Sequence, residues 1–248
     1  MSFKEYAKYY DLIYLEKKYN LESNYILKIF KTFNKKKSSN ILEVGCGSGR
    51  HANIFYQKGH NVIGIDSSKA MINLAKKQFP QINFFCQNAK NFKLNKKFDL
   101  IVLNFHVINF FSPAVILNFF KSAKKHLKKN GLLIFDFVGK YALIFDKPKK
   151  KTKFFFDKSE KLKIKRITTP QFSQKRSIFK IIFDISIYKK EVKIKKFREI
   201  HTLYLYSLVD FIKKTNLDFE YIKSFKYLTK RKFIEKKHWN GLCIFKKV

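Results

Sequence analysis

The sequence is poor in the residues that build disulfide-rich, metal-binding and membrane-spanning proteins. Its three cysteines, Cys46, Cys86 and Cys243, are too few and too far apart for a disulfide framework or a zinc cluster. No uncharged apolar run of about 18 residues is present to span a bilayer. The charged N-terminal segment lacks the apolar core of a signal peptide. These absences predict a cytoplasmic protein with no metal site.

Acidic residues and arginine are also scarce. Lys and Arg total 54 against 18 for Asp and Glu, which gives a net charge of +36, and only five of the basic residues are Arg. Such a charge suits nucleic-acid binding. However, nucleic-acid recognition favours arginine, and the abundance of Lys, Phe, Ile and Asn indicates coding bias. Nucleic acid is therefore the less favoured partner, and the field favours an anionic small molecule.

Apolar patterning predicts alternating strands and helices up to residue 138. Helical spacing covers residues 5–34 first. Strands are then predicted at 41–44, 61–66, 82–87, 98–105 and 132–138, with helices at 50–59, 67–79 and 113–131 between them. This order is typical of an α/β, Rossmann-like, doubly wound and mostly parallel sheet, which binds ligands beyond the carboxyl ends of its strands.

The pattern changes after Asp146. Residues 147–156 break the alternation, and period-two alternation then predicts antiparallel strands at 161–168, 177–189 and 191–206. A helix over 207–219 and a strand over 241–248 follow. The chain therefore inserts an antiparallel β-sheet after the fifth strand of the main sheet.

The stretch "ILEVGCGSGR" places a glycine turn directly after the first strand. Gly45, Gly47 and Gly49 lack the Lys–Ser/Thr pair of an NTPase phosphate loop and the spacing of a dinucleotide fingerprint. Asp66 ends the next strand, where a carboxylate can accept both ribose hydroxyls of an adenosine. A tight turn with only a structural role is the alternative.

Together with "VIGIDSSKAMINLAKK", this stretch resembles the class I S-adenosylmethionine-dependent methyltransferases. The resemblance implies S-adenosylmethionine as cofactor, with its methionyl end at the glycine turn and its ribose on Asp66. Met71 either packs on the adenine or belongs to the core, and Asn88 stands where the family commonly has an acidic residue. The cofactor-binding residues predicted in this way are Tyr10, Tyr19, Glu43, Gly45, Cys46, Gly47, Asp66, Ser67, Met71, Asn88, Ala89 and Asn104.

The segments before and after this core resemble a smaller group within the methyltransferases. "YYDLIYLEKKY" and "FREIHTLYLYSLVDFIKKTNLDFEYI" resemble small-molecule N-methyltransferases that act on nucleotide-linked amino sugars or on glycine and sarcosine. The resemblance implies that the N-terminal aromatic segment folds over the cofactor. The predicted divisions are a helical lid (1–37), a cofactor-binding core (38–146 and 207–248) and an antiparallel insertion (147–206) that serves as a lid or a homodimer contact.

Two histidines are candidate proton acceptors for the amine. His106 follows the fourth strand, and His201 shares a strand face with Glu199. Imidazole titrates near neutrality, which suits general base catalysis. Either histidine could instead only shape the pocket, and in the sugar enzymes the loop histidine falls where this chain has Phe110.

The sequence therefore predicts methyl transfer to a small-molecule amine, foremost that of a nucleotide-linked amino sugar. A glycine-type amine, a sugar hydroxyl, RNA and a non-enzymatic cofactor binder are the alternatives. The chain has "NFHV" after the fourth strand, without the Pro-Pro motif of base-amine methyltransferases. Arg50 and His51 stay unassigned, either capping the next helix or facing the acceptor.

Overall fold

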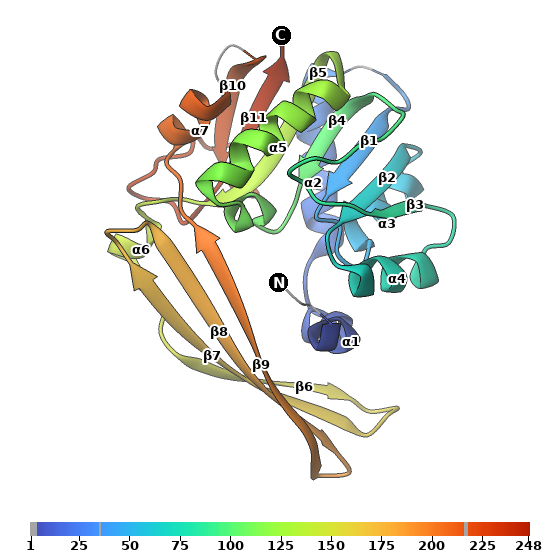
Figure 1. Ribbon diagram of the computed structural model, residues 1–248, viewed down its shortest axis with the longest axis vertical. Coiled ribbons are helices and arrows are strands. Elements are labelled where there is room, and N and C mark those ends of the chain that lie inside the picture. The colour runs from blue at the N-terminus through green and yellow to red at the C-terminus, as the bar shows by residue number, and fades with distance from the viewer. Residues whose placement is uncertain (1–3, 35, 216–217) are drawn as a thin grey trace.

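The apolar strands assemble into one seven-stranded sheet in the computed structural model, which describes residues 4–34, 36–215 and 218–248. Its strand order is β10–β11–β5–β4–β1–β2–β3 (Figure 1). The strands are β1 (Asn40–Val44), β2 (Asn61–Asp66), β3 (Asn83–Cys86), β4 (Phe98–Leu103), β5 (Leu127–Val138), β10 (Phe219–Lys226) and β11 (Asn240–Lys247). Strands β1 to β5 run parallel, and β11 runs antiparallel to both of its neighbours. The predicted Rossmann-like sheet is confirmed.

Helices cover both faces of this sheet, because successive side chains of a strand point to opposite sides. On β4, Leu100 and Val102 join one apolar cluster, while Ile101 and Leu103 join the other. The first cluster holds α2 (Tyr19–Phe33), α3 (Arg50–Gln57) and α4 (Lys69–Gln78), and the second holds α5 (Pro113–His126) and α7 (Leu208–Thr215). These two layers fix the carboxyl ends of β1, β2 and β4 at one edge.

A second sheet extends from this edge. It has the antiparallel order β6–β7–β8–β9, formed by β6 (Lys151–Asp157), β7 (Leu162–Ser173), β8 (Ile178–Lys189) and β9 (Val192–Tyr204). The short helix α6 (Ala142–Phe145) leads into it from β5. Alternation along β8 buries Phe183, Ile185 and Ile187 on one face of this insertion. Within the described residues, no helix is long and apolar enough to cross a membrane.

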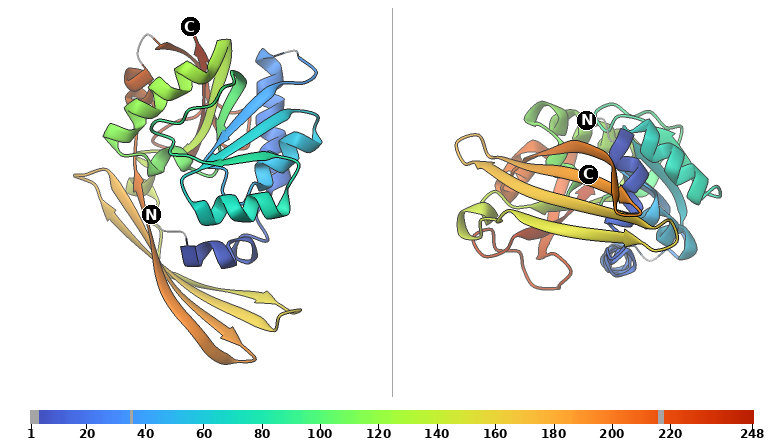
Figure 2. Two further views of the ribbon diagram at one scale, coloured as in Figure 1. Left: turned by 45° about the vertical axis from the view of Figure 1, so that its right-hand side comes forward. Right: turned by 90° about the horizontal axis from the view of Figure 1, so that it is seen from below.

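Helix α1 (Lys4–Ile13) lies between the main domain and the insertion (Figures 1 and 2). Tyr6 and Ile13 of α1 pack in one apolar cluster with the inner face of β7 and β8. Helix α2 instead packs its apolar face on the main sheet, through Ile26 and Phe30 among others. The prediction of continuous helix over 5–34 is therefore wrong at residues 14–18, where the chain turns because the two helices have different packing partners.

Three predicted boundaries also need correction. The helix predicted over 113–131 ends at His126, because Leu127 already pairs with Phe98 in the sheet and the register then shifts. Residues 151–157, predicted to break the pattern, form β6, which pairs along β7. The helix predicted over 207–219 ends at Thr215, and Phe219 begins β10; residues 216–217 lie outside the described residues.

Substitution of two glycines tests how tightly the turn before α3 is packed. Gly49 has φ +81° and a Cβ there would lie 2.7 Å from Phe84, whereas Gly59 has φ +84° and open space around it. Gly59→Ala should therefore cost only the left-handed strain, about 1–2 kcal/mol. Gly49→Ala should cost about 1–3 kcal/mol more from overpacking. Urea unfolding measures both, and equal losses would contradict this packing.

Candidate active site

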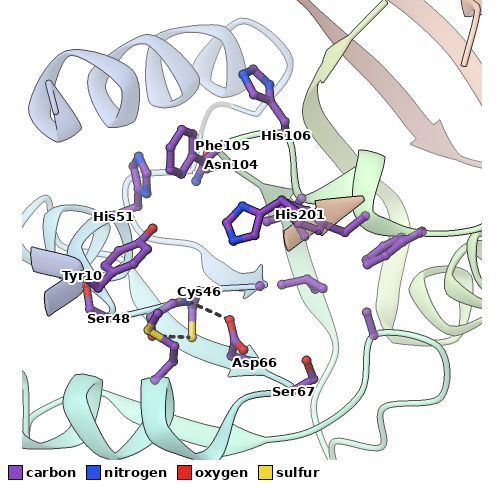
Figure 3. A pocket seen from close by; sticks show the side chains of 18 of the residues that line it. Tyr10, Cys46, Ser48, His51, Asp66, Ser67, Asn104, Phe105, His106 and His201 are labelled. Carbon is purple, nitrogen blue, oxygen red and sulfur yellow. Dashed lines mark hydrogen bonds between the residues drawn. The ribbon is translucent and has the colours of Figure 1, made fainter. Parts of the chain in front are cut away.

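A cavity of about 400 Å³ opens at the carboxyl ends of β1, β2 and β4. Its other walls come from α1, from the 3₁₀ helix η1 (Val107–Phe110) and from β8 and β9 of the insertion. In Figure 3 the side chains of Tyr10, Cys46, Asp66 and His201 face a common space. The insertion was predicted as a lid or a dimer contact; it supplies a wall of the cavity through Ile181, Phe183 and Leu203, among others.

The glycine turn forms the floor of the cavity. Gly45, Gly47 and Gly49 all have positive φ, and the backbone N–H groups of Gly45 and Cys46 both donate to the Ile65 carbonyl, at 2.7 and 3.0 Å. A Cβ on Gly45 would lie 2.6 Å from the Val107 side chain. Only glycine fits this conformation and this approach, so the backbone itself can face a ligand.

Asp66 stands at the end of β2 with its carboxylate held by backbone. Its Oδ2 accepts the Gly47 N–H at 3.0 Å and its Oδ1 accepts the Ser68 N–H at 2.8 Å. Burial raises the pKa of Asp66, and these hydrogen bonds oppose the rise. Each oxygen keeps a further lone pair, so the carboxylate can accept two hydroxyls from the cavity.

Glu43 does not line the cavity itself but holds two residues that do. It is buried, and its Oε1 accepts a hydrogen bond from Asn104 Nδ2 at 3.0 Å and lies 3.6 Å from His51 Nδ1. His51 Nε2 lies 2.8 Å from Glu22 of α2, whose carboxylate also binds Lys17. Burial raises the pKa of Glu43. Burial would also raise that of Glu22, but hydrogen bonds to His51 and Lys17 hold it low.

The other predicted cofactor residues gather around the same cavity. Its lining includes Tyr10, Tyr19, Cys46, Ser67, Met71, Asn88, Ala89 and Asn104. Met71 is buried and still lines the cavity, so the structure leaves both of its predicted alternatives open. Burial raises the pKa of the Cys46 thiol well above its ordinary value, so this residue stays uncharged and is no nucleophile.

Asp11 joins α1, part of the predicted lid, to the main domain. Its Oδ1 accepts hydrogen bonds from Ser48 Oγ and from Arg50 Nε, both at 2.9 Å. Its Oδ2 accepts a hydrogen bond from Gln78 of α4. Arg50, unassigned from the sequence, thus binds the lid and lines the cavity. No sequence pattern indicates Asp11, because its partners lie on distant segments.

The imidazole of His106 lies beside the cavity, next to a buried carboxylate. His106 has φ 60° at the start of η1, and its Nδ1 lies 2.9 Å from Oδ2 of the buried Asp136. The His106 backbone N–H donates to the other Asp136 oxygen at 3.0 Å. In Figure 3 the ring points away from His201 and Asp66. Asp136 therefore holds the backbone of this loop, and the His106 ring lies beside its carboxylate without a hydrogen bond.

His201 faces the cavity from β9. Aromatic rings of Tyr6, Phe183 and Phe110 pack edge-on against it at 5.7, 5.0 and 5.5 Å between centroids. Glu199, on the same strand face as predicted, places Oε1 3.9 Å from His201 Nε2. Burial, with a smaller contribution from the charge of Arg166, lowers the pKa of His201 to about 4. Its imidazole is therefore uncharged at neutral pH.

Comparisons with known sequences agree with this site. Residues 41–131 match the methyltransferase domain family. The dTDP-3-amino-3,4,6-trideoxy-alpha-D-glucopyranose N,N-dimethyltransferase of Streptomyces venezuelae is 27% identical over 133 residues, covering 52% of this chain and 56% of that protein. A relative from Geobacillus sp. (strain WCH70) aligns over 60% of its own length. The chain thus spans little more than half the length of these curated relatives.

Solved structures share the whole fold. An S-adenosylmethionine-dependent methyltransferase from Clostridium acetobutylicum superposes with a TM-score of 0.81 at 22% identity, covering 98% of both chains. Streptomyces venezuelae DesVI gives 0.80 at 18% identity, also over 98% of both chains. These likenesses confirm the predicted fold with its inserted sheet. With the matched domain, they confirm the predicted resemblance to class I methyltransferases and support an enzyme that uses S-adenosylmethionine.

Removing the Asp66 carboxylate should abolish cofactor binding. Each hydrogen bond to a charged group is worth about 1.5–3 kcal/mol, so losing two ribose contacts should weaken S-adenosylhomocysteine binding more than about 100-fold. Calorimetry on Asp66→Ala measures this loss. Asp184→Ala, on the opposite face of the insertion, is the control and should bind normally. Near-normal affinity in Asp66→Ala would refute the predicted role.

Loosening the lid should weaken cofactor binding less severely. Asp11→Ala removes the acceptor shared by Ser48, Arg50 and Gln78, so the closed lid loses stability. We expect about tenfold weaker binding, expressed as faster dissociation in stopped-flow measurements. Glu16→Ala changes an exposed carboxylate just after α1 and should leave the rate unchanged. Equal dissociation rates in both variants would show that Asp11 does not hold the lid.

Proposed function

We propose that this protein is an S-adenosylmethionine-dependent methyltransferase that methylates the amine of a nucleotide-linked amino sugar. The observation that carries the proposal is one cavity with two different ends. One end has the glycine turn and Asp66, and the other has His201 among aromatic rings from the lid, η1 and the insertion. This arrangement supports an adenosyl cofactor at the first end and an acceptor at the second.

The bound cofactor supplies a methyl group that its sulfonium already activates. The chain therefore has to bind, orient and exclude water. Asp66 accepts the ribose hydroxyls, the Gly45–Gly47 backbone receives the methionyl end, and Asn88 and Ala89 lie where the adenine would. Tyr10 and Tyr14 of the lid segment close the cavity above the turn. Asp11 holds that lid in place and so helps to exclude water.

The acceptor amine needs a neighbour that accepts a hydrogen bond from its N–H and so orients its lone pair, and His201 suits this role better than His106. The His201 imidazole is uncharged and faces the cavity, so it can accept a hydrogen bond from an amine. The His106 ring lies beside Asp136 and points away from His201 and Asp66. We therefore assign hydrogen-bond acceptance from the neutral amine to His201 and loop positioning to His106.

The nature of the acceptor is inferred from charge and from one relative. The Streptomyces venezuelae relative is named as acting on a dTDP-linked amino sugar. The net charge of +36 would attract the diphosphate of such a substrate. An apolar chamber with one uncharged imidazole suits the amine end of the sugar.

Substitution of the two histidines separates their roles. His201→Phe should lower turnover of an amino-sugar nucleotide by about 10- to 100-fold, because the amine loses the hydrogen bond that orients it. It should leave S-adenosylhomocysteine affinity unchanged. His106→Ala should lower turnover less, because it only loosens the loop. Release of S-adenosylhomocysteine is assayed with dTDP- and UDP-linked amino sugars, with glycine and sarcosine as comparison. Full activity of His201→Phe, or turnover of the amino acids alone, would contradict the proposal.

A further inference from the structure

Arg166 is a cation placed in apolar surroundings. It lies on the inner face of β7, half-buried, with its guanidinium carbon 5.7 Å from the ring of Tyr14, 5.0 Å from Phe155 and 4.9 Å from Phe183. Its Nε and Nη1 atoms are buried without a hydrogen-bond acceptor among the described residues, while the side chain makes a hydrogen bond with Tyr6. Burying a charge beside a neutral hydroxyl and aromatic rings is costly. Neither the cofactor contacts nor the lid contacts described above account for Arg166.

Phe183 connects this guanidinium to the active site. One contact joins Arg166 to the Phe183 ring at 4.9 Å, and the Phe183 ring meets the His201 ring at 5.0 Å, nearly perpendicular. The two contacts place the positive charge within about 10 Å of the imidazole, with the Phe183 ring in contact with both groups. In a medium of low polarity, a charge acts strongly over this distance. Arg166 is therefore placed to influence whatever charge appears at the acceptor end of the cavity.

Among the described residues, three elements place charged or titratable groups around His201. Glu199 of β9 lies 3.9 Å away, Tyr6 of α1 packs edge-on, and Arg166 approaches from β7. A Glu199 carboxylate would favour the charged imidazolium, but burial raises the pKa of Glu199 as well. Burial raises the pKa of Tyr6, so this group stays neutral. Arg166 is therefore the group whose charge opposes protonation at this end.

We propose that the positive charge of Arg166, which contacts the acceptor end through Phe183, disfavours any further positive charge there. As a result, both His201 and the acceptor nitrogen are uncharged at this end of the cavity. The proposal rests on the proposed function, since it concerns the acceptor amine. A nearby cation is a known way to keep an amine in its nucleophilic form. Arg166 is a positioning residue, because it acts through its field and touches no reacting atom.

The chemistry explains why the neutral amine matters. An ammonium has no lone pair and cannot attack. During transfer the nitrogen lone pair forms the new N–C bond while the C–S bond breaks, and its electron pair stays on sulfur. The positive charge thus passes from sulfur to nitrogen, and the surplus N–H proton then leaves to water. An amine that enters the cavity already neutral is ready for this step.

The titration of His201, followed by NMR of its labelled imidazole, tests the proposal without catalysis. In the wild-type protein its midpoint should lie well below the ordinary value of about 6.5. Arg166→Met should raise the midpoint by about one pH unit, and Arg166→Lys should restore it. The acid limb of kcat/KM should move in the same direction. A wild-type midpoint at the ordinary value, or no change in Arg166→Met, would overturn the proposal.

Controls separate this result from misfolding and from failure of the proposed function. Arg198→Met makes the same change on the outer face of β9, where Arg198 pairs with Asp184, and should leave the midpoint unchanged. If Arg166→Met does not fold, Arg166→Gln replaces it, and the same rise in the His201 midpoint is expected. The wild-type midpoint, which should lie below the ordinary value, tests the proposal without any variant. S-adenosylhomocysteine calorimetry runs in parallel: no binding by the wild type would reject the proposed function, while the His201 titration would still report on Arg166.

Discussion

The hydrogen bond between the Asp66 carboxylate and the Gly47 N–H ties together the parts on which the site depends. It joins the end of β2 to the turn that follows β1, and it forms because Gly47 adopts a left-handed conformation that brings its N–H to face the carboxylate. The same glycine turn also presents Ser48 and Arg50 to Asp11 of α1. The floor of the cavity, the Asp66 carboxylate and the attachment of α1 are therefore set by one stretch of backbone.

Much of this floor was predictable because it is encoded locally. The spacing of Gly45, Gly47 and Gly49 and the position of Asp66 after a short apolar strand carry the prediction within about 25 residues. Alternating strands and helices likewise predicted the main sheet, since each element shows its own period. The errors fell at boundaries such as Leu127 and β6, where pairing with a distant strand decides the conformation rather than the local pattern.

The walls and the lid were less predictable because they depend on contacts between distant segments. Asp11 meets Ser48, Arg50 and Gln78 only after folding, and His51 meets Glu22 across 29 residues. The alternation of β9 indicated that Glu199 and His201 share a face, but not that this face closes the cavity. The aromatic rings around His201 and around Arg166 became apparent only in the assembled insertion. The main domain thus carries the Asp66 end of the cavity, and the insertion shapes the His201 end.

The central claim is that the Asp66 end of the cavity holds the cofactor and the His201 end holds the acceptor. A crystal structure of the protein with S-adenosylhomocysteine tests it most directly. The account predicts both ribose hydroxyls within hydrogen-bond distance of the Asp66 oxygens, the homocysteine moiety against the Gly45–Gly47 backbone, and the sulfur directed toward the chamber that contains His201. A ligand bound in the reverse direction or elsewhere, or no binding at millimolar concentration, would contradict it.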